Sequence, residues 1–190
     1  YKGLMEANIK KEDYHHAFIY GEKLFQLNPF IDNLYLTLVS IIAKTRNWNQ
    51  LIYISKEAYN KKIINLKTFN QNTAIAYYEI SKIKINSDST ESLNLILKAI
   101  KLNGLFPPFI KLHLEILLIK NEISKINKVV KKYWNSQPNS SLRSIISEFL
   151  KKNNISSIDD IKFITKGNYD DKESKKLLVD FSIHNSDWAL

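Results

Sequence analysis

The sequence predicts an all-α fold, a solenoid of antiparallel helix pairs stacked in a right-handed superhelix. Apolar residues that close helical segments recur at three successive intervals, at Leu24, Ala58, Ala99 and Tyr133. Helix-ending positions recur at the same three intervals, at Pro29, Ile63, Gly104 and Pro138. Aromatic residues open helical segments at Tyr14 and Trp48, separated by the first of these intervals. Because these markers repeat together, one structural unit recurs along the chain.

The first and last intervals are about 34 residues, a period typical of tetratricopeptide repeats, in which a pair of antiparallel helices buries its apolar face by stacking on its neighbours. We expect a single repeat domain over residues 1–190, with successive repeats at about 1–30, 31–64, 65–105, 106–138, 139–169 and 170–190. The middle interval, which spans the third repeat, is longer by about seven residues, or about two helical turns. Residues 66–85 are therefore predicted to form one helix that is longer than its counterparts.

Apolar residues spaced i, i+3, i+4, i+7 predict the individual helices. In the first half of the chain these helices cover residues 1–10, 14–27, 31–45, 47–60 and 66–85. Pro29 stops the second because proline cannot continue the hydrogen-bond ladder, and Asn86-Ser87-Asp88 caps the helix that ends near Gly104. Pro107-Pro108 opens the next helix, where a missing N–H costs nothing. Its partner contains Ile126 to Trp134, and shorter helices follow at 139–152, 157–167 and 172–184.

Composition supports helices and excludes several functions. The chain is 44% hydrophobic with four glycines and four prolines, too few for a many-turned β protein. It has no cysteine, which removes disulfides, zinc–thiolate sites and thiol catalysis. It contains neither eighteen consecutive apolar residues nor a signal-peptide pattern, so we expect a soluble piece. It begins without Met and ends at a new helix signal, Asp187-Trp188-Ala189, which suggests a fragment of a longer array.

The net charge of +9 raises the possibility of nucleic-acid binding. Arginine, whose planar fork suits phosphates and bases, occurs only at Arg46 and Arg143. The densest basic segment holds Lys125, Lys128, Lys131 and Lys132 at helical spacing. We interpret it as the solvated face of a repeat helix, with contact to anionic lipid or nucleic acid as the alternative.

The histidines, aspartates and tryptophans that could bind a ligand or act in catalysis are better explained by structural roles. Adjacent histidines, His15 and His16, point in different directions on a helix, whereas metal ligands need i, i+4 spacing. A haem contact by His16 or His113 is the lesser alternative. Aspartate pairs at 159–160 and 170–171 stand at expected helix starts, where they cap free N–H groups. The aromatic rings of Trp48, Trp134 and Trp188 are expected in the core. No catalytic residue, metal site or cofactor is predicted.

The later part of the chain carries a more particular resemblance. Ile126 through Tyr133-Trp134, four residues before Pro138, then a short helix pair and Ser186-Asp187-Trp188-Ala189, resembles the C-terminal repeat region of the proteobacterial HemY family. The resemblance implies membrane-spanning helices before the repeats and a non-catalytic helper role in late haem biosynthesis. It implies a location at the bacterial inner membrane, with the repeat domain on the cytoplasmic side. Isolated glycines exclude the dinucleotide-binding turn of a flavin enzyme.

The tetratricopeptide resemblance also implies a binding groove, lined by the first helix of each pair. Its register assigns to the concave side Lys2, Glu6, Asn33, Leu36, Ser40, Ala74, Tyr77, Ser81, Pro108, Lys111 and Glu115. This mixed surface suits a partner helix or an extended peptide with apolar anchors, and Tyr77 is the best single anchor candidate. We therefore expect a protein-binding scaffold, the soluble arm of a HemY-like factor. The alternatives are a generic chaperone or secretion adaptor and a nucleic-acid-binding helical repeat.

Overall fold

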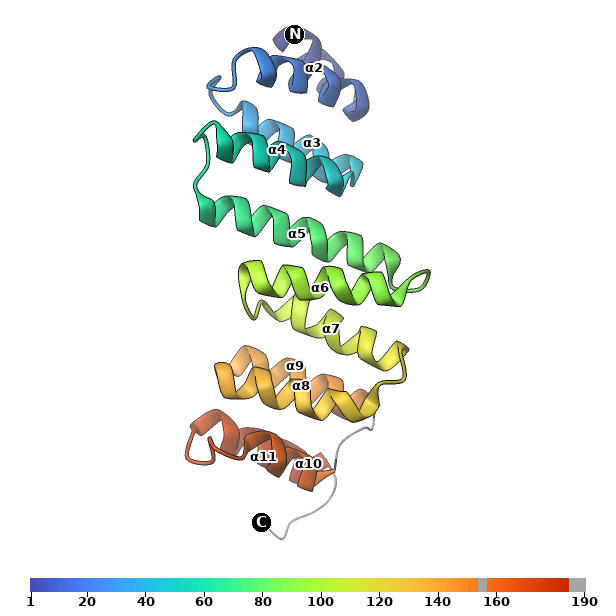
Figure 1. Cartoon of the computed structure of the whole chain (residues 1–190), viewed down its shortest axis with the longest axis vertical. Helices are drawn as coiled ribbons and strands as arrows, with labels where there is room; N and C mark the ends of the chain where they lie inside the picture. The colour runs from blue at the N-terminus through green and yellow to red at the C-terminus, as the bar shows by residue number, and fades with distance from the viewer. Residues whose placement is uncertain (154–156, 185–190) are drawn as a thin grey trace. The chain divides into compact units, whose positions relative to one another are not determined.

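A computed structural model describes residues 1–153 and 157–184, and its regular structure is helical throughout these ranges (Figure 1). This part of the chain contains the helices α1 (Lys2–Lys10), α2 (Tyr14–Leu27), α3 (Leu34–Thr45), α4 (Trp48–Asn60), α5 (Leu66–Lys84), α6 (Ser89–Asn103), α7 (Pro107–Ile119), α8 (Ile123–Ser136), α9 (Ser140–Asn153), α10 (Ile158–Thr165) and α11 (Lys172–His184). The predicted all-α fold class of antiparallel helix pairs is confirmed. The right-handed superhelix and the division into six repeats stay predictions.

The repeat markers lie where the spacing placed them. Tyr14 and Trp48 are the first residues of α2 and α4. The helix-ending positions lie one to three residues beyond α2, α4, α6 and α8, at Pro29, Ile63, Gly104 and Pro138. The turn inside a helix pair also recurs, because Glu12 and Arg46, one repeat period apart, both have a positive φ, of 59° and 54°. The same local geometry is thus repeated at the same interval.

One helix begins later than expected. The third helical segment was predicted to start at residue 31, but α3 starts at Leu34. Asn33, just before it, has a φ of 59°, a left-handed conformation that a right-handed helix does not continue.

The prediction of a lengthened helix in the third repeat is confirmed. α5 is one unbroken helix of 19 residues, compared with 12 in α3 and 13 in α7. The seven inserted residues therefore extend the helix and do not form a loop.

The helices form two compact units, residues 1–83 with 101–103, and residues 84–100 with 104 onward. The first unit packs α1 on α2, α2 on α3 and α3 on α4. A Cβ atom on Gly21 would lie 2.8 Å from Leu38 Cδ2 and 2.9 Å from Met5 Sδ, so these three helices approach closely there. The Tyr35 hydroxyl lies 3.1 Å from Ser55 Oγ and accepts from Asn72 Nδ2 at 2.6 Å, which links α3 to α4 and α5.

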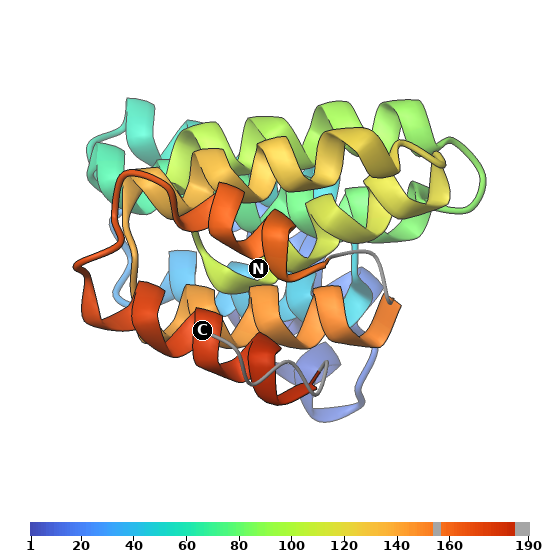
Figure 2. The same ribbon diagram turned by 90° about the horizontal axis from the view of Figure 1, so that it is seen from below.

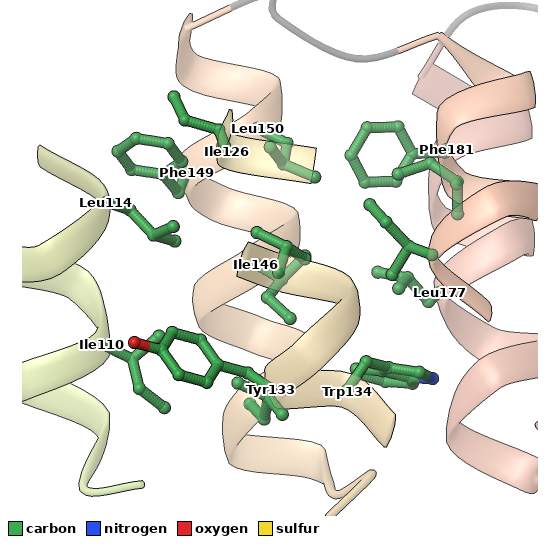
Figure 3. Packing of buried hydrophobic residues seen from close by; sticks show 14 of the residues in the cluster. Ile110, Leu114, Ile126, Tyr133, Trp134, Ile146, Phe149, Leu150, Leu177 and Phe181 are labelled. Atoms are coloured by element: carbon green, nitrogen blue, oxygen red, sulfur yellow. The ribbon is translucent and has the colours of Figure 1, made fainter. Parts of the chain in front are cut away.

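The second unit has its own core. α7 packs on α8 and α9, α10 packs on α8, and α11 packs on α9. α10 also packs on α11, and Figure 2 shows both helices from the side. Figure 3 shows the apolar residues between these helices, with Ile146 at the centre of the cluster and Trp134 at one side of it, near Leu177. The Trp134 indole N–H donates to Ser174 Oγ at 2.8 Å. Trp134 is therefore a core residue, as predicted, and Trp48 is partly buried. Trp188 and its neighbours Ser186, Asp187 and Ala189 lie outside the described residues.

Candidate functional site

A cavity of about 310 Å³ opens on the second unit, between α7, α9 and the two residues that follow α5. Its apolar surface comes from Leu118 and Ile119 on α7 and from Ile145 and Phe149 on α9. Phe149 also belongs to the core behind the cavity (Figure 3). The floor of the cavity is therefore part of the packed interior, which holds it in place.

Charged side chains border this apolar floor. Lys111 and Glu115, one helical turn apart on α7, face Glu148 and Lys152, one turn apart on α9. Lys111 Nζ lies 3.3 Å from Glu148 Oε1 and forms an ion pair between the two helices. Other residues of the same helices, such as Ile110 and Ile146, are fully buried in the core of the second unit. Each helix thus presents one apolar face to the core and one mixed face to the cavity.

The turn after α5 supplies the remaining wall. Ile85 and Asn86, directly after the helix, line the cavity. Asp88 Oδ1 accepts the Glu91 N–H at 2.9 Å, and Lys84 forms an ion pair with Glu91, so this turn is held on both sides. These contacts keep Ile85 and Asn86 at the border of the cavity.

A network on the far side of α9 keeps that helix in position. Arg143 Nε donates to Glu173 Oε2 at 2.9 Å, and Arg143 Nη1 donates to Asp180 Oδ2 at 2.6 Å, both on α11. Hydrogen bonds from Lys176 and Arg143 lower the pKa of Glu173, so the carboxylate stays charged. The α9 face of the cavity is consequently supported by fixed charge pairs behind it.

The residues of the predicted groove have different surroundings. Lys111 and Glu115 line the cavity. In the first unit, five predicted positions are exposed to solvent or nearly so: Lys2, Glu6, Asn33, Leu36 and Ser40. Their contact with a partner stays a prediction, as does that of Tyr77 and Pro108, which are partly buried.

Two predicted groove residues need correction. Ala74 and Ser81 on α5 are both 0% exposed, so no partner can contact their side chains. Their small side chains allow neighbouring protein to close over these positions. The register placed them on the groove because it treats every position on one helical face alike, whatever packs against that face.

Sequence reasoning missed the α9 side of the cavity. The register stopped at the fourth repeat, but one further repeat period takes Lys111 to Ile145 and Glu115 to Phe149. Both residues line the cavity. The charged residues Glu148 and Lys152 would not have been found by this step, nor would Ile85 and Asn86.

His113 is a buried core histidine, 5% exposed, and its Nδ1 is hydrogen-bonded to the hydroxyl of Tyr133. Burial lowers the pKa of His113 to about 4 and raises the pKa of Tyr133. His16 is exposed and its Nδ1 lies 2.7 Å from Asp13 Oδ2. In the described ranges, no three His, Cys, Asp or Glu residues gather where they could hold a metal ion.

The aspartates act at helix starts. Asp160 forms a reciprocal capping box with Ser157 at α10, and Asp171 Oδ2 accepts the Glu173 and Ser174 N–H groups at 2.9 Å each. These two predicted caps are confirmed.

The lysine-rich face of α8 is largely solvated. Lys125 and Lys132 are exposed, while Lys131 Nζ lies 3.7 Å from the centre of the Phe163 ring.

None of the described helices is both long enough and apolar enough to cross a membrane.

No family model matches the chain, and no curated protein matches it. Among solved structures it is similar to MamA, at 14% identity and a TM-score of 0.45, over 96% of this chain and 95% of that one. A thermophilic TPR protein of Thermus thermophilus is 13% identical with a TM-score of 0.39, over 97% and 98% of the two chains. A tetratricopeptide repeat protein of Parabacteroides merdae is 13% identical with a TM-score of 0.44, over 96% and 71%. The repeat assignment rests on the helix spacing of the chain itself.

Proposed function

We propose that this protein is a non-catalytic scaffold that binds a segment of a partner protein in the cavity of the second unit. The observation that carries the proposal is the combination of an apolar floor with a charged rim, on the helix face that the repeat register assigns to ligands. A buried apolar centre inside a polar rim is the usual anatomy of a protein interface.

The size of the cavity limits the occupant. At about 310 Å³ it is at the lower end of the range for ligand pockets, which is about 300–1,000 Å³. It has room for one or two bulky apolar side chains and not for a whole helix. A peptide or helix would therefore lie across the cavity and insert an anchor residue.

A pair of matched variants tests this proposal. Ile119 lines the cavity and is 52% exposed, while Ile123 is 42% exposed and lies outside it on α8. Both can be replaced by Trp without opening the core. We expect peptides selected on the wild-type chain from a random library to bind Ile123→Trp normally and to bind Ile119→Trp at least about tenfold more weakly in calorimetry.

Circular dichroism and thermal melting of both variants provide the control for folding. Equal binding to the two Trp variants would contradict the proposal, as would a library that yields no peptide above an unrelated control protein.

We also propose a more specific role, as a HemY-like factor. The segment from Ile126 to Pro138 supports a HemY-like factor at the inner membrane, associated with haem biosynthesis, with its repeats in the cytoplasm. Fractionation of the full-length protein in its own cells tests the location, and porphyrin levels in a deletion strain test the pathway. A protein found wholly in the soluble fraction would contradict this role and would leave the scaffold proposal standing.

A further inference from the structure

The cavity lies between two helices that run in the same direction, because two chain reversals separate α7 from α9 (Figure 1). Lys111 on α7 pairs with Glu148 on α9, 37 residues later. Glu115 and Lys152 are separated by the same interval, one turn further along each helix. The rim therefore holds two opposed charge pairs of reversed order, positive then negative on α7 and negative then positive on α9.

Only the first of these two pairs forms an ion pair; we call the second, Glu115 and Lys152, the open pair. The Lys111–Glu148 ion pair is formed at 3.3 Å, whereas in the described part of the chain neither Glu115 nor Lys152 takes part in an ion pair. Both line the cavity together with Leu118 and Phe149, Glu115 from α7 and Lys152 from α9. Glu115 is half-buried at the border of the cavity, and its carboxylate is available to a cation of the ligand.

We propose that this open pair selects the partner: a polypeptide segment whose apolar anchor is flanked by a basic residue on the α7 side and an acidic residue on the α9 side. This inference rests on the proposed function and adds the chemistry of the ligand. The base meets Glu115, the acid meets Lys152, and the anchor fills the space between them. Because charge complementarity fixes which flank lies on which helix, the pair also sets the direction of the bound segment.

The wall formed by the turn after α5 contributes to the same recognition. Asn86 lines the cavity beside the apolar Ile85, and Asn153, whose Nδ2 donates to Phe149 O at 2.8 Å, lines it at the end of α9. Amide groups donate and accept, so they suit the main chain of a peptide of any sequence. The anchor and the two charges, and not the amides, would then carry the sequence preference.

A charge-swapped variant provides the test. Glu115→Lys combined with Lys152→Glu keeps the net charge and reverses the open pair. The control is Glu79→Lys combined with Lys82→Glu, which reverses an ion pair of 3.2 Å on α5, outside the residues that line the cavity. A random peptide library is panned on the full chain, and the best peptide is synthesised together with a version in which its two flanking charges are exchanged.

We expect wild type and the control to prefer the selected peptide by at least about tenfold, and the swapped variant to prefer the exchanged peptide. Equal affinity of both peptides for wild type and for the swapped variant would overturn the inference. If those peptides still lose affinity on Ile119→Trp, the proposed function survives that failure. If Ile119→Trp has no effect on them, the cavity is not the binding site and both proposals fail.

Discussion

The buried pair of His113 and Tyr133 makes the stability of the second unit dependent on pH. His113 lies on α7 and Tyr133 on α8, and both are almost fully buried. Removal from water lowers the pKa of His113 from 6.5 to about 4; nearby Glu122 opposes this shift and Lys132 adds to it. The folded protein therefore keeps the imidazole neutral over a range in which the unfolded chain binds a proton.

The direction of the effect follows from proton linkage. Well above pH 6.5 the imidazole is neutral in both states and adds no pH dependence. As the pH falls from 6.5 to about 4, the unfolded state takes up a proton that the folded state does not bind, so the free energy of unfolding decreases. At about 1.4 kcal/mol for each unit of pKa difference, the loss is about 3 kcal/mol.

His113→Gln isolates this contribution, because a glutamine amide can bond the Tyr133 hydroxyl but does not titrate. Denaturant unfolding followed by tryptophan fluorescence, with the buried Trp134 as reporter, gives the free energy of unfolding at each pH. We expect the wild type to lose about 3 kcal/mol more than His113→Gln across the range. Carboxylates such as Asp13, whose pKa is lowered by hydrogen bonds from His16, contribute equally to both proteins.

Tyr133→Phe separates burial from hydrogen bonding. Burial is the main cause of the low pKa, so this variant should keep the pH dependence of the wild type. It should be less stable at every pH by about 1–3 kcal/mol, because a buried ring nitrogen loses its partner. Parallel pH curves for wild type and His113→Gln, or a His113 imidazole resonance that titrates near 6.5 in the folded protein, would refute the reasoning.

Three further predictions concern the packing and one helix cap. Gly21→Val should destabilise by about 1–3 kcal/mol in chemical denaturation, because its side chain meets Leu38 and Met5; an unchanged midpoint would contradict the close approach. Ile146→Ala should cost about 2–5 kcal/mol in the same assay, because Ile146 is fully buried in the core of the second unit, and a loss below about 1 kcal/mol would mean that the core can collapse. Asp171→Ala should cost about 1 kcal/mol by removing the cap of α11, whereas the exposed Asp170→Ala should cost almost nothing; equal effects would remove the capping role.

Helix boundaries were predictable from the sequence because their causes are local. Pro29 and Pro138 end helices through their own ring geometry, and Asp160 and Asp171 cap helices through N–H groups two or three residues away. The start of α3 was missed because the left-handed conformation of Asn33 has a weak sequence signal. Asparagine tolerates that conformation but does not require it.

The candidate site was predictable only in part, because a cavity depends on segments far apart in the chain. Lys111 and Glu115 followed from the register of their own helix, whereas Ile85 required knowing where the chain goes after α5. The burial of Ala74 and Ser81 was invisible for a related reason. A small side chain is compatible with solvent and with close packing, and only the neighbouring helices decide between them.

The inserted residues of the third repeat leave the pattern of α5 intact for a geometric reason. At about 100° per residue, seven residues turn a helix by about 700°, only about 20° short of two full turns. The insertion therefore leaves the buried face of α5 almost in register while it moves the helix end by about 10 Å along the axis. An insertion of five residues would instead have turned the following face by about 140° and exposed its apolar side. The length of the insertion thus explains why helical periodicity continues through α5 as far as the turn that supplies Ile85 and Asn86 to the cavity.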